Sequence, residues 1–247
     1  MERIFLEDRV RNEGFETIPH KMVIAIDGPA GSGKSTVAKL LAEKLGYLYV
    51  DTGAMYRALT YKALKKKVDL GGEDILTSLS RQTKILLKEK EGKLKVFLDG
   101  EEVTENIREE SVTNNAFYIA RVPGVRTEMV KQQREMAEEN NLVMEGRDIG
   151  TVVFPGADLK VYLDASLKER AKRRFLELKE KGVKTNTKRI GEELKIRDKK
   201  DKNRKVAPLK VAGDAFVIDS TKMEIEEEVN LILKKWRKKY GTTKSRT

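Results

Sequence analysis

Near its start the chain reads Gly28-Pro29-Ala30-Gly31-Ser32-Gly33-Lys34-Ser35, which fits the pattern G-x-x-x-x-G-K-[ST] of a phosphate-binding loop, the P-loop. Glycine adopts backbone angles that other residues avoid, so such a loop turns tightly and points successive N–H groups at bound phosphates. Lys34 is expected to reach the β- and γ-phosphates, and the Ser35 hydroxyl to bind Mg²⁺. This loop, together with Thr36 after it, is a candidate nucleotide-binding site.

The residues on either side of the loop predict the strand and the helix that a P-loop requires. Residues 22–26 are all apolar, which is typical of a buried strand. Val37, Leu40 and Leu41 then recur at helical spacing, and Gly46 suits the position just beyond a helix end. The alternative, a glycine-rich turn that binds nothing, is disfavoured by this context.

Composition indicates one α/β domain with insertions. The chain has 247 residues, of which 39% are hydrophobic and 37% charged, and it has no cysteine. The lack of cysteine excludes disulfides and thiolate chemistry. No apolar run approaches membrane-spanning length and the N-terminus lacks a signal-peptide core, so we expect a cytoplasmic enzyme without a membrane partner.

The net charge of +11 comes largely from the region after residue 167 and from the run at residues 234–239. The excess can attract anionic small substrates, or it can bind nucleic acid. The basic segments are not regularly interleaved with the aromatic residues that stack on single strands, which disfavours nucleic acid as a partner. A solvated helix face is the simplest interpretation of residues 234–239.

Short apolar strands alternate with amphipathic helices along the chain, which predicts a parallel sheet with helices on both faces. Residues 1–21 are expected to form an extension dispensable for catalysis, and residues 22–247 a single domain. The predicted strands cover residues 22–27, 47–50, 142–145, 159–164 and 215–219. The predicted helices cover residues 34–45, 53–66, 73–87, 124–139, 167–181, 187–199 and 224–239.

One segment departs from this alternation. Residues 84–103 contain two apolar runs and the pair Asp99-Gly100, a hairpin turn signal. We therefore predict a small antiparallel insertion outside the parallel core.

Charged residues follow two predicted strands, at the edge where ligands bind on parallel sheets. After the second strand, Thr52 can cap the next helix and Arg57 can reach a phosphate. After the third, Arg147 and Asp148 lie in a loop with two flanking glycines, which favours ligand contact. The alternatives are an ordinary helix cap with a surface arginine, and a structural ion pair between Arg147 and Asp148.

A third charged cluster contains Arg197, Asp201 and Arg204, which lie on one face if the segment is helical. A solvated ladder of ion pairs would have the same spacing. Arg170, Arg173 and Arg174 add cations upstream.

These motifs, in this order, resemble those of the bacterial cytidylate kinases, which are nucleoside monophosphate kinases. The likeness runs from Met22 to about Lys239 and is carried by Asp51-Thr52-Gly53-Ala54-Met55-Tyr56-Arg57, by Glu145-Gly146-Arg147-Asp148-Ile149-Gly150-Thr151-Val152-Val153-Phe154-Pro155, by Arg197 to Arg204 with Val206-Ala207-Pro208-Leu209, and by Asp219-Ser220-Thr221. The resemblance implies a P-loop NTPase-type fold with a monophosphate-binding region at about 51–126 and a mobile lid at about 170–205. It also implies transfer of the γ-phosphoryl group of ATP to CMP or dCMP, with Mg²⁺, by a protein that tends to be a monomer.

By position, the resemblance also implies roles for individual residues. Lys34, Arg57 and Arg147 would be catalytic, and the two arginines would hold the acceptor phosphate. Arg126 and Asp148 would face the cytosine, Arg197 and Asp201 the sugar; Thr52 and Arg204 would also lie in the acceptor pocket, and Arg173 of the lid would contact ATP. Thr52 stands where serine is common, and Phe117 where some members carry a serine that touches the nucleotide. The sequence therefore leaves open how strongly the protein prefers ribose over deoxyribose and CMP over UMP.

Three other functions remain to be weighed. The P-loop alone does not separate this family from adenylate, guanylate or shikimate kinases, whereas the later motifs favour CMP. A GTP-dependent switch would read guanine through an N-K-x-D-type element, but Asn186-Thr187-Lys188-Arg189 lacks the aspartate. The third alternative is a protein that binds nucleic acid and uses ATP. Salt-dependent binding of RNA would identify it.

Overall fold

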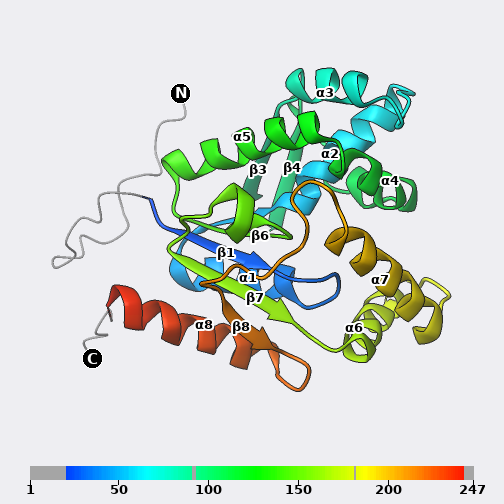
Figure 1. Cartoon of the computed structure of the whole chain (residues 1–247). Helices are drawn as coiled ribbons and strands as arrows, with labels where there is room; N and C mark the ends of the chain where they lie inside the picture. Colours follow the sequence, from blue (N-terminus) through cyan, green and yellow to red (C-terminus); the bar gives the residue numbers. More distant parts are fainter. Residues whose placement is uncertain (1–20, 91–92, 181, 242–247) are drawn as a thin grey trace.

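The structure, a computed structural model, describes residues 21–90, 93–180 and 182–241. Its centre is a five-stranded sheet in the order β2-β6-β1-β7-β8 (Figure 1), and every neighbouring pair is parallel. The strands are β1 (Val23–Asp27), β2 (Leu48–Asp51), β6 (Leu142–Gly146), β7 (Leu159–Asp164) and β8 (Phe216–Asp219). This confirms the predicted parallel sheet, with each strand within one residue of its expected bounds.

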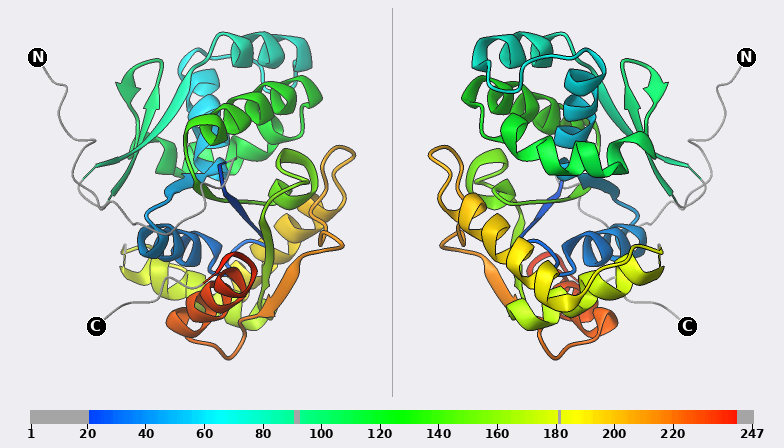
Figure 2. Two further views of the ribbon diagram at one scale, coloured as in Figure 1. Left: turned by 90° about the vertical axis from the view of Figure 1, so that its left-hand side faces the viewer. Right: turned by 90° about the vertical axis from the view of Figure 1, so that its right-hand side faces the viewer.

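The two faces of the sheet bury different hydrophobic clusters. Along β1, Val23 and Ala25 belong to one cluster, while Ile24 and Ile26 belong to the other, as the two-residue period of a strand requires. The second face is covered by α1 (Lys34–Leu45) and α8 (Ile225–Tyr240), and the first by α2 (Thr52–Lys65) and α5 (Pro123–Glu139). Figure 2 shows these helices on opposite sides of the sheet. Helices thus cover both faces, as predicted.

The insertion stands on the α2 side of the sheet (Figure 2). It contains a three-stranded antiparallel sheet in the order β3-β4-β5, with Asp99-Gly100 turning between the last two strands. Its elements are α3 (Glu73–Arg81), β3 (Ile85–Lys90), β4 (Lys93–Leu98), β5 (Glu101–Glu102), the 3₁₀ turn η1 (Asn106–Arg108) and α4 (Glu110–Ala120). The predicted antiparallel segment is confirmed.

The predicted helix at 73–87 is wrong in its last turns, because Ile85 and Leu87 enter β3. Their side chains are buried while those between and after them are exposed, and Ile85 pairs with Leu98 of β4. Pairing with β4 overrides the local helical spacing. The helix α4 was not predicted from the sequence.

A helical pair lies beyond the carboxyl ends of the strands, α6 (Leu167–Glu180) and α7 (Thr187–Lys202) (Figure 1). A small apolar cluster packs Ala171 of α6 and Ile190 and Leu194 of α7 against Ala30 of the P-loop. The pair is thereby attached to the phosphate-binding loop, in the part of the chain expected to form a lid.

None of the helices in the described ranges is long and apolar enough to cross a membrane. The predicted extension, residues 1–21, lies outside the described residues except for Lys21. Its separation from a single domain at 22–247 stays a prediction.

Candidate active site

The P-loop connects β1 to α1, as predicted, and its shape depends on glycine. Gly28 has a φ of 155°, and a Cβ there would lie 2.1 Å from the carbonyl oxygen of Leu163. Gly33, just before α1, has a φ of 95°. Because both positions are strained for other residues, the loop can turn closely around a phosphate at the start of a helix.

Lys34 begins α1 and folds back over the loop. Its Nζ donates to the carbonyl oxygen of Pro29 at 2.7 Å and lies 3.4 Å from Oγ of Ser32. Burial, reinforced by the nearby charge of Arg147, lowers the pKa of Lys34 to about 7. About half of the amine is therefore neutral near pH 7, and a bound phosphate would favour its charged form.

We expect nucleotide binding to draw a proton onto Lys34. At about pH 8 the free protein should hold the amine mostly neutral, so binding of Mg·ADP should take up as much as about one proton. Calorimetry in buffers of different ionisation enthalpy measures this uptake. Equal uptake by the variant Lys34→Met would contradict the assignment.

Ser35 also lies where the P-loop motif places it. Its hydroxyl donates to Oε1 of Glu145, the penultimate residue of β6, at 2.6 Å. Burial, reinforced by Asp51, raises the pKa of Glu145. A hydroxyl beside a carboxylate is an oxygen donor set that suits Mg²⁺, which usually takes one or two protein oxygens plus substrate phosphates. Thr36 lies exposed in the next position of α1.

The second strand brings Thr52 and Arg57 to the same edge, but Thr52 does not cap the helix. Asp51 is the N-cap of α2, since its side chain accepts the N–H of Ala54 at 2.9 Å. Thr52 is buried, and its hydroxyl donates to the carbonyl oxygen of Glu145 at 2.8 Å. Arg57 is held against Asp51 by a 3.0 Å ion pair. The expected cap by Thr52 is thus wrong, because the carboxylate one residue earlier takes that role.

Arg147 and Asp148 do not pair with each other, which rules out the local ion pair considered above. Arg147 donates from Nε to Oδ2 of Asp201 at 2.9 Å. Asp148 binds the guanidinium of Arg126 instead, and both side chains are buried. Two neighbouring residues therefore point at two different partners.

The Arg126–Asp148 pair lies beneath the ring of Tyr56, whose centroid is 5.6 Å from the guanidinium carbon. The Tyr56 hydroxyl is buried without a hydrogen-bond partner. Arg204 is close enough to the same pair to be affected by it: burial lowers its pKa, and so does the charge of Arg126. Two nitrogens of Arg204, Nε and Nη2, are also buried without hydrogen-bond partners. Unsatisfied donors at this density are costly unless a ligand binds them.

The three charged residues predicted on one helix face are brought together, although Arg204 does not lie on the helix. The helix α7 runs three residues past its predicted end at 199 and ends at Lys202, so Arg204 lies beyond it. Burial raises the pKa of Asp201, but Arg147, Arg197 and Arg204 outweigh this effect and lower it. Arg197 is exposed to solvent on one side of this cluster; the surrounding protein and the charge of Arg147 lower its pKa. The cluster is a convergence of cations around one carboxylate and not a solvated ladder.

Comparison with known proteins identifies the family. A model of the family described as cytidylate kinase matches residues 24–238 of the chain. The chain belongs to the cytidylate kinase family. The match confirms the resemblance given by the ordered motifs, and it covers both the parallel core and the insertion.

Curated relatives in the cytidylate kinase family are similar over most of their length. The cytidylate kinase of Bacillus licheniformis is 51% identical over 214 residues, which cover 86% of this chain and 95% of the relative. That of a Geobacillus species is 52% identical over 210 residues, covering 85% and 94%. Among solved structures, a shikimate kinase from Bacteroides thetaiotaomicron has a TM-score of 0.45 at 14% identity, covering 87% of this chain and 98% of that one.

The arginines of α6 support the P-loop from outside. Arg170 donates to the carbonyl oxygen of Ala30 at 3.1 Å and pairs with Asp198 of α7 at 2.8 Å. Arg173 donates to the carbonyl oxygens of Ser32 and Ser220, at 3.2 and 2.7 Å. Arg174 instead pairs with Glu177 along the helix surface. In this family member, Arg170 and Arg173 therefore connect the helical pair to the loop.

Phe117 lies on α4 and faces the same helical pair. The Nζ of Lys200, on α7, is 5.0 Å from the centre of the Phe117 ring. An aromatic ring in this place makes a cation–π contact and offers no hydroxyl to a nucleotide.

Sequence reasoning did not single out Asp27 and Glu145 as site residues. Both lie at the ends of buried strands and are themselves buried. A carboxylate at the carboxyl end of a central parallel strand is a usable signal, since buried charges need partners or a ligand.

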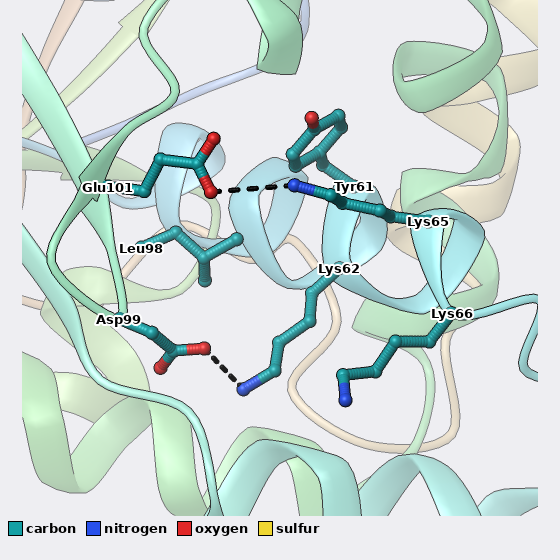
Figure 3. Close-up of a pocket in the computed structure, with 7 residues that line it drawn as sticks. All are labelled: Tyr61, Lys62, Lys65, Lys66, Leu98, Asp99 and Glu101. Carbon is teal, nitrogen blue, oxygen red and sulfur yellow. Dashed lines mark hydrogen bonds and ion pairs between the residues drawn. The ribbon is translucent and has the colours of Figure 1, made fainter.

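A separate cavity of about 230 Å³ lies between α2 and the β4–β5 turn (Figure 3). Two ion pairs line it, Lys62–Asp99 at 2.5 Å and Lys65–Glu101 at 3.4 Å. These pairs neutralise Lys62 and Lys65, and Lys66 also lines the cavity. The lining comes from α2 and the β4–β5 turn, away from the P-loop.

Proposed function

We propose that the chain transfers the γ-phosphoryl group of ATP to CMP and dCMP, giving ADP and CDP or dCDP. One observation carries this beyond family membership. Arg147 is close enough to Lys34 of the P-loop for its charge to lower the pKa of that amine. The charges of Arg147 and Arg57 likewise lower the pKa of Arg197. Cations from three strand ends and from α7 thus converge where the donor and acceptor phosphates must meet.

The chemistry needs positioning and charge neutralisation more than covalent participation. An oxygen of the acceptor phosphate attacks the γ-phosphorus, and the bond to the leaving oxygen of ADP breaks. Lys34, protonated by the approaching phosphates, would neutralise the transferring group. Arg57 and Arg147 would hold the acceptor phosphate in line, each already oriented by its ion pair with Asp51 or Asp201.

Ser35 and Glu145 would hold Mg²⁺ with ATP, which fits their oxygen donors. The ion, when bound, supplies positive charge to the phosphate oxygens. The Ser35–Glu145 contact keeps both groups in place beside the P-loop.

The acceptor base would be read by the buried Arg126–Asp148 pair. Cytosine carries an N4 amine that donates to a carboxylate, whereas uracil presents an acceptor at the same place. Arg197 and Asp201 would face the sugar. Arg204 has two nitrogens without hydrogen-bond partners and would donate to an oxygen or nitrogen atom of the bound CMP.

The helical pair α6–α7 would act as the lid, corresponding to about 170–205, and the insertion as the monophosphate-binding region at about 51–126. Closure would exclude water, which otherwise competes as acceptor. A role for Arg173 at ATP would be indirect in the arrangement seen here, through the carbonyl of Ser32. A monomeric state and a cytoplasmic location stay predictions.

Incubation with ATP labelled at the γ-phosphate tests the proposed reaction. The label should appear in CDP when CMP is present, and ADP should remain unlabelled. Label found in inorganic phosphate alone, at the same rate with and without CMP, would contradict a phosphotransferase.

Removal of residues 1–21 should leave kcat and both KM values within about two-fold of the full chain. The backbone nitrogen of Met22 donates to Asn141 at 2.8 Å, and a new amino terminus there can still donate. Steady-state kinetics of the two chains side by side measures this, and a loss of activity on truncation would overturn the prediction.

A further inference from the structure

Asp27 lies between the two halves of the site. It is the last residue of β1, directly before the P-loop, and its relative exposure is 4%. Its carboxylate accepts two hydrogen bonds from the segment that follows β6. Oδ1 accepts the N–H of Ile149 and Oδ2 accepts the N–H of Gly150, both at 2.8 Å.

These two N–H groups begin the π-helical turn at Ile149–Val153, which directly follows Arg147 and Asp148. The first N–H groups of a helical turn have no partner within it, so an outside acceptor fixes where the turn starts. The fit is close, because a Cβ on Gly150 would lie 3.2 Å from Lys160 and 3.4 Å from Oδ2 of Asp27. Arg147 and Asp148 directly precede this turn in the chain.

We propose that Asp27 is a positioning residue that holds the loop carrying Arg147 and Asp148 in register with the P-loop. The inference rests on the proposed function, since it assigns the acceptor to that loop. A single carboxylate then connects β1, which leads into the ATP-binding P-loop, to the loop that would bind the acceptor nucleotide CMP. Misplacement of reacting groups by about 1 Å can cost about 10²-fold in rate, so such a connection bears directly on turnover.

The connection requires the ionised form of Asp27. A protonated carboxyl would turn one oxygen into a donor facing another N–H donor, and one of the two hydrogen bonds would be lost. The charged or titratable groups acting on this carboxylate are Lys34 of α1, Asp148 and Arg147 of the held loop, and Tyr162 of β7. Burial, opposed by the two N–H groups, raises the pKa of Asp27 to about 6. The held arrangement is therefore complete above this pH and lost as the pH falls through it.

The test compares Asp27→Asn with Asp158→Asn. Asp158 is also buried and accepts a backbone N–H, that of Val23 at 2.8 Å, but at the opposite end of β1. Asn at 27 presents an NH₂ group to one of the two N–H donors. Asp27→Asn should lower kcat/KM for CMP by about 10²-fold while the KM for ATP changes by less than about three-fold. Asp158→Asn should lower the Tm and leave both parameters near those of the unchanged protein.

The pH profile separates positioning from a general loss of stability. The acceptor phosphate itself titrates near pH 6, but it does so equally in every variant. The ratio of kcat/KM between the unchanged protein and Asp27→Asn should therefore fall by about ten-fold between pH 8 and pH 5, while the ratio to Asp158→Asn stays constant.

A second variant guards against poor folding of Asp27→Asn. Gly150→Ala pushes on the same contact from the other side and should lower kcat/KM for CMP while the KM for ATP changes by less than about three-fold. An unchanged kcat/KM for CMP in both variants, a KM for ATP that rises as much as the KM for CMP, or a pH-independent ratio would overturn the positioning role. Failure of the unchanged protein to phosphorylate CMP would instead refute the proposed function.

Discussion

Lys34→Met should lower kcat by about 10³-fold, because the variant removes the one lysine of the P-loop from the transferring phosphoryl group. The same change should shift the Tm little. Burial lowers the pKa of Lys34 to about 7, and the relief of that burial by a methionine of similar volume offsets the loss of the hydrogen bond to the carbonyl oxygen of Pro29. Steady-state kinetics and a thermal melt on the same sample measure both effects.

Lys62→Met is the matched control with the opposite pattern. Lys62 is also buried, but it pairs with Asp99 at 2.5 Å and donates to the carbonyl oxygen of Gln82 at 2.9 Å, away from the P-loop. Its replacement should lower the Tm, since the carbonyl loses its donor, and should leave kcat nearly unchanged. A fall in kcat of similar size in both variants would contradict the role given to Lys34.

Asp148→Asn should reduce the preference for CMP over UMP by about 10²-fold or more in kcat/KM. The carboxylate only accepts hydrogen bonds and so suits the N4 amine of cytosine, whereas an amide can also donate to O4 of uracil. The KM for ATP should change little, because the P-loop residues do not bind Asp148. Kinetics with CMP and UMP as alternative acceptors measures the preference.

The variant also weakens a buried ion pair, so its Tm must be compared with that of a control. Asp148 binds the guanidinium of Arg126, whose side chain is buried, and Asn keeps one acceptor there. Asp158→Asn removes another buried carboxylate charge without touching the site. A lower Tm with an unchanged CMP/UMP preference would remove Asp148 from base recognition.

Most of the fold could be predicted because its signals are local. The apolar run at 22–26 and the glycines of the P-loop specify β1, the loop and α1 without reference to the rest of the chain. Ile85 and Leu87 show where this fails, because helical spacing and strand alternation are both compatible with so short a run. Their pairing with β4 decides the outcome and depends on residues farther along the chain. The helix α4 was missed, although its two buried residues, Val112 and Ile119, are seven positions apart, which is a helical spacing.

The sequence predicted which residues lie at the site, but not which of them form ion pairs with one another. Strand ends place Arg57, Arg147 and Asp148 at one edge by topology alone. That Arg147 turns to Asp201, and Asp148 to Arg126, follows from the packing of α5 and α7 around the loop and has no signature in sequence spacing. Asp27 ends a central strand, which marks it as a candidate, but its role was not predictable, because its partners are backbone N–H groups more than a hundred residues away.

The most direct test of the account is ADP formation by the full chain with Mg·ATP and one acceptor at a time: CMP, dCMP, UMP, AMP, GMP or none. The account predicts turnover on CMP and dCMP, with kcat/KM for UMP lower by about 10²-fold or more. Turnover that is as fast on AMP or GMP, or that occurs only without an acceptor, would contradict it.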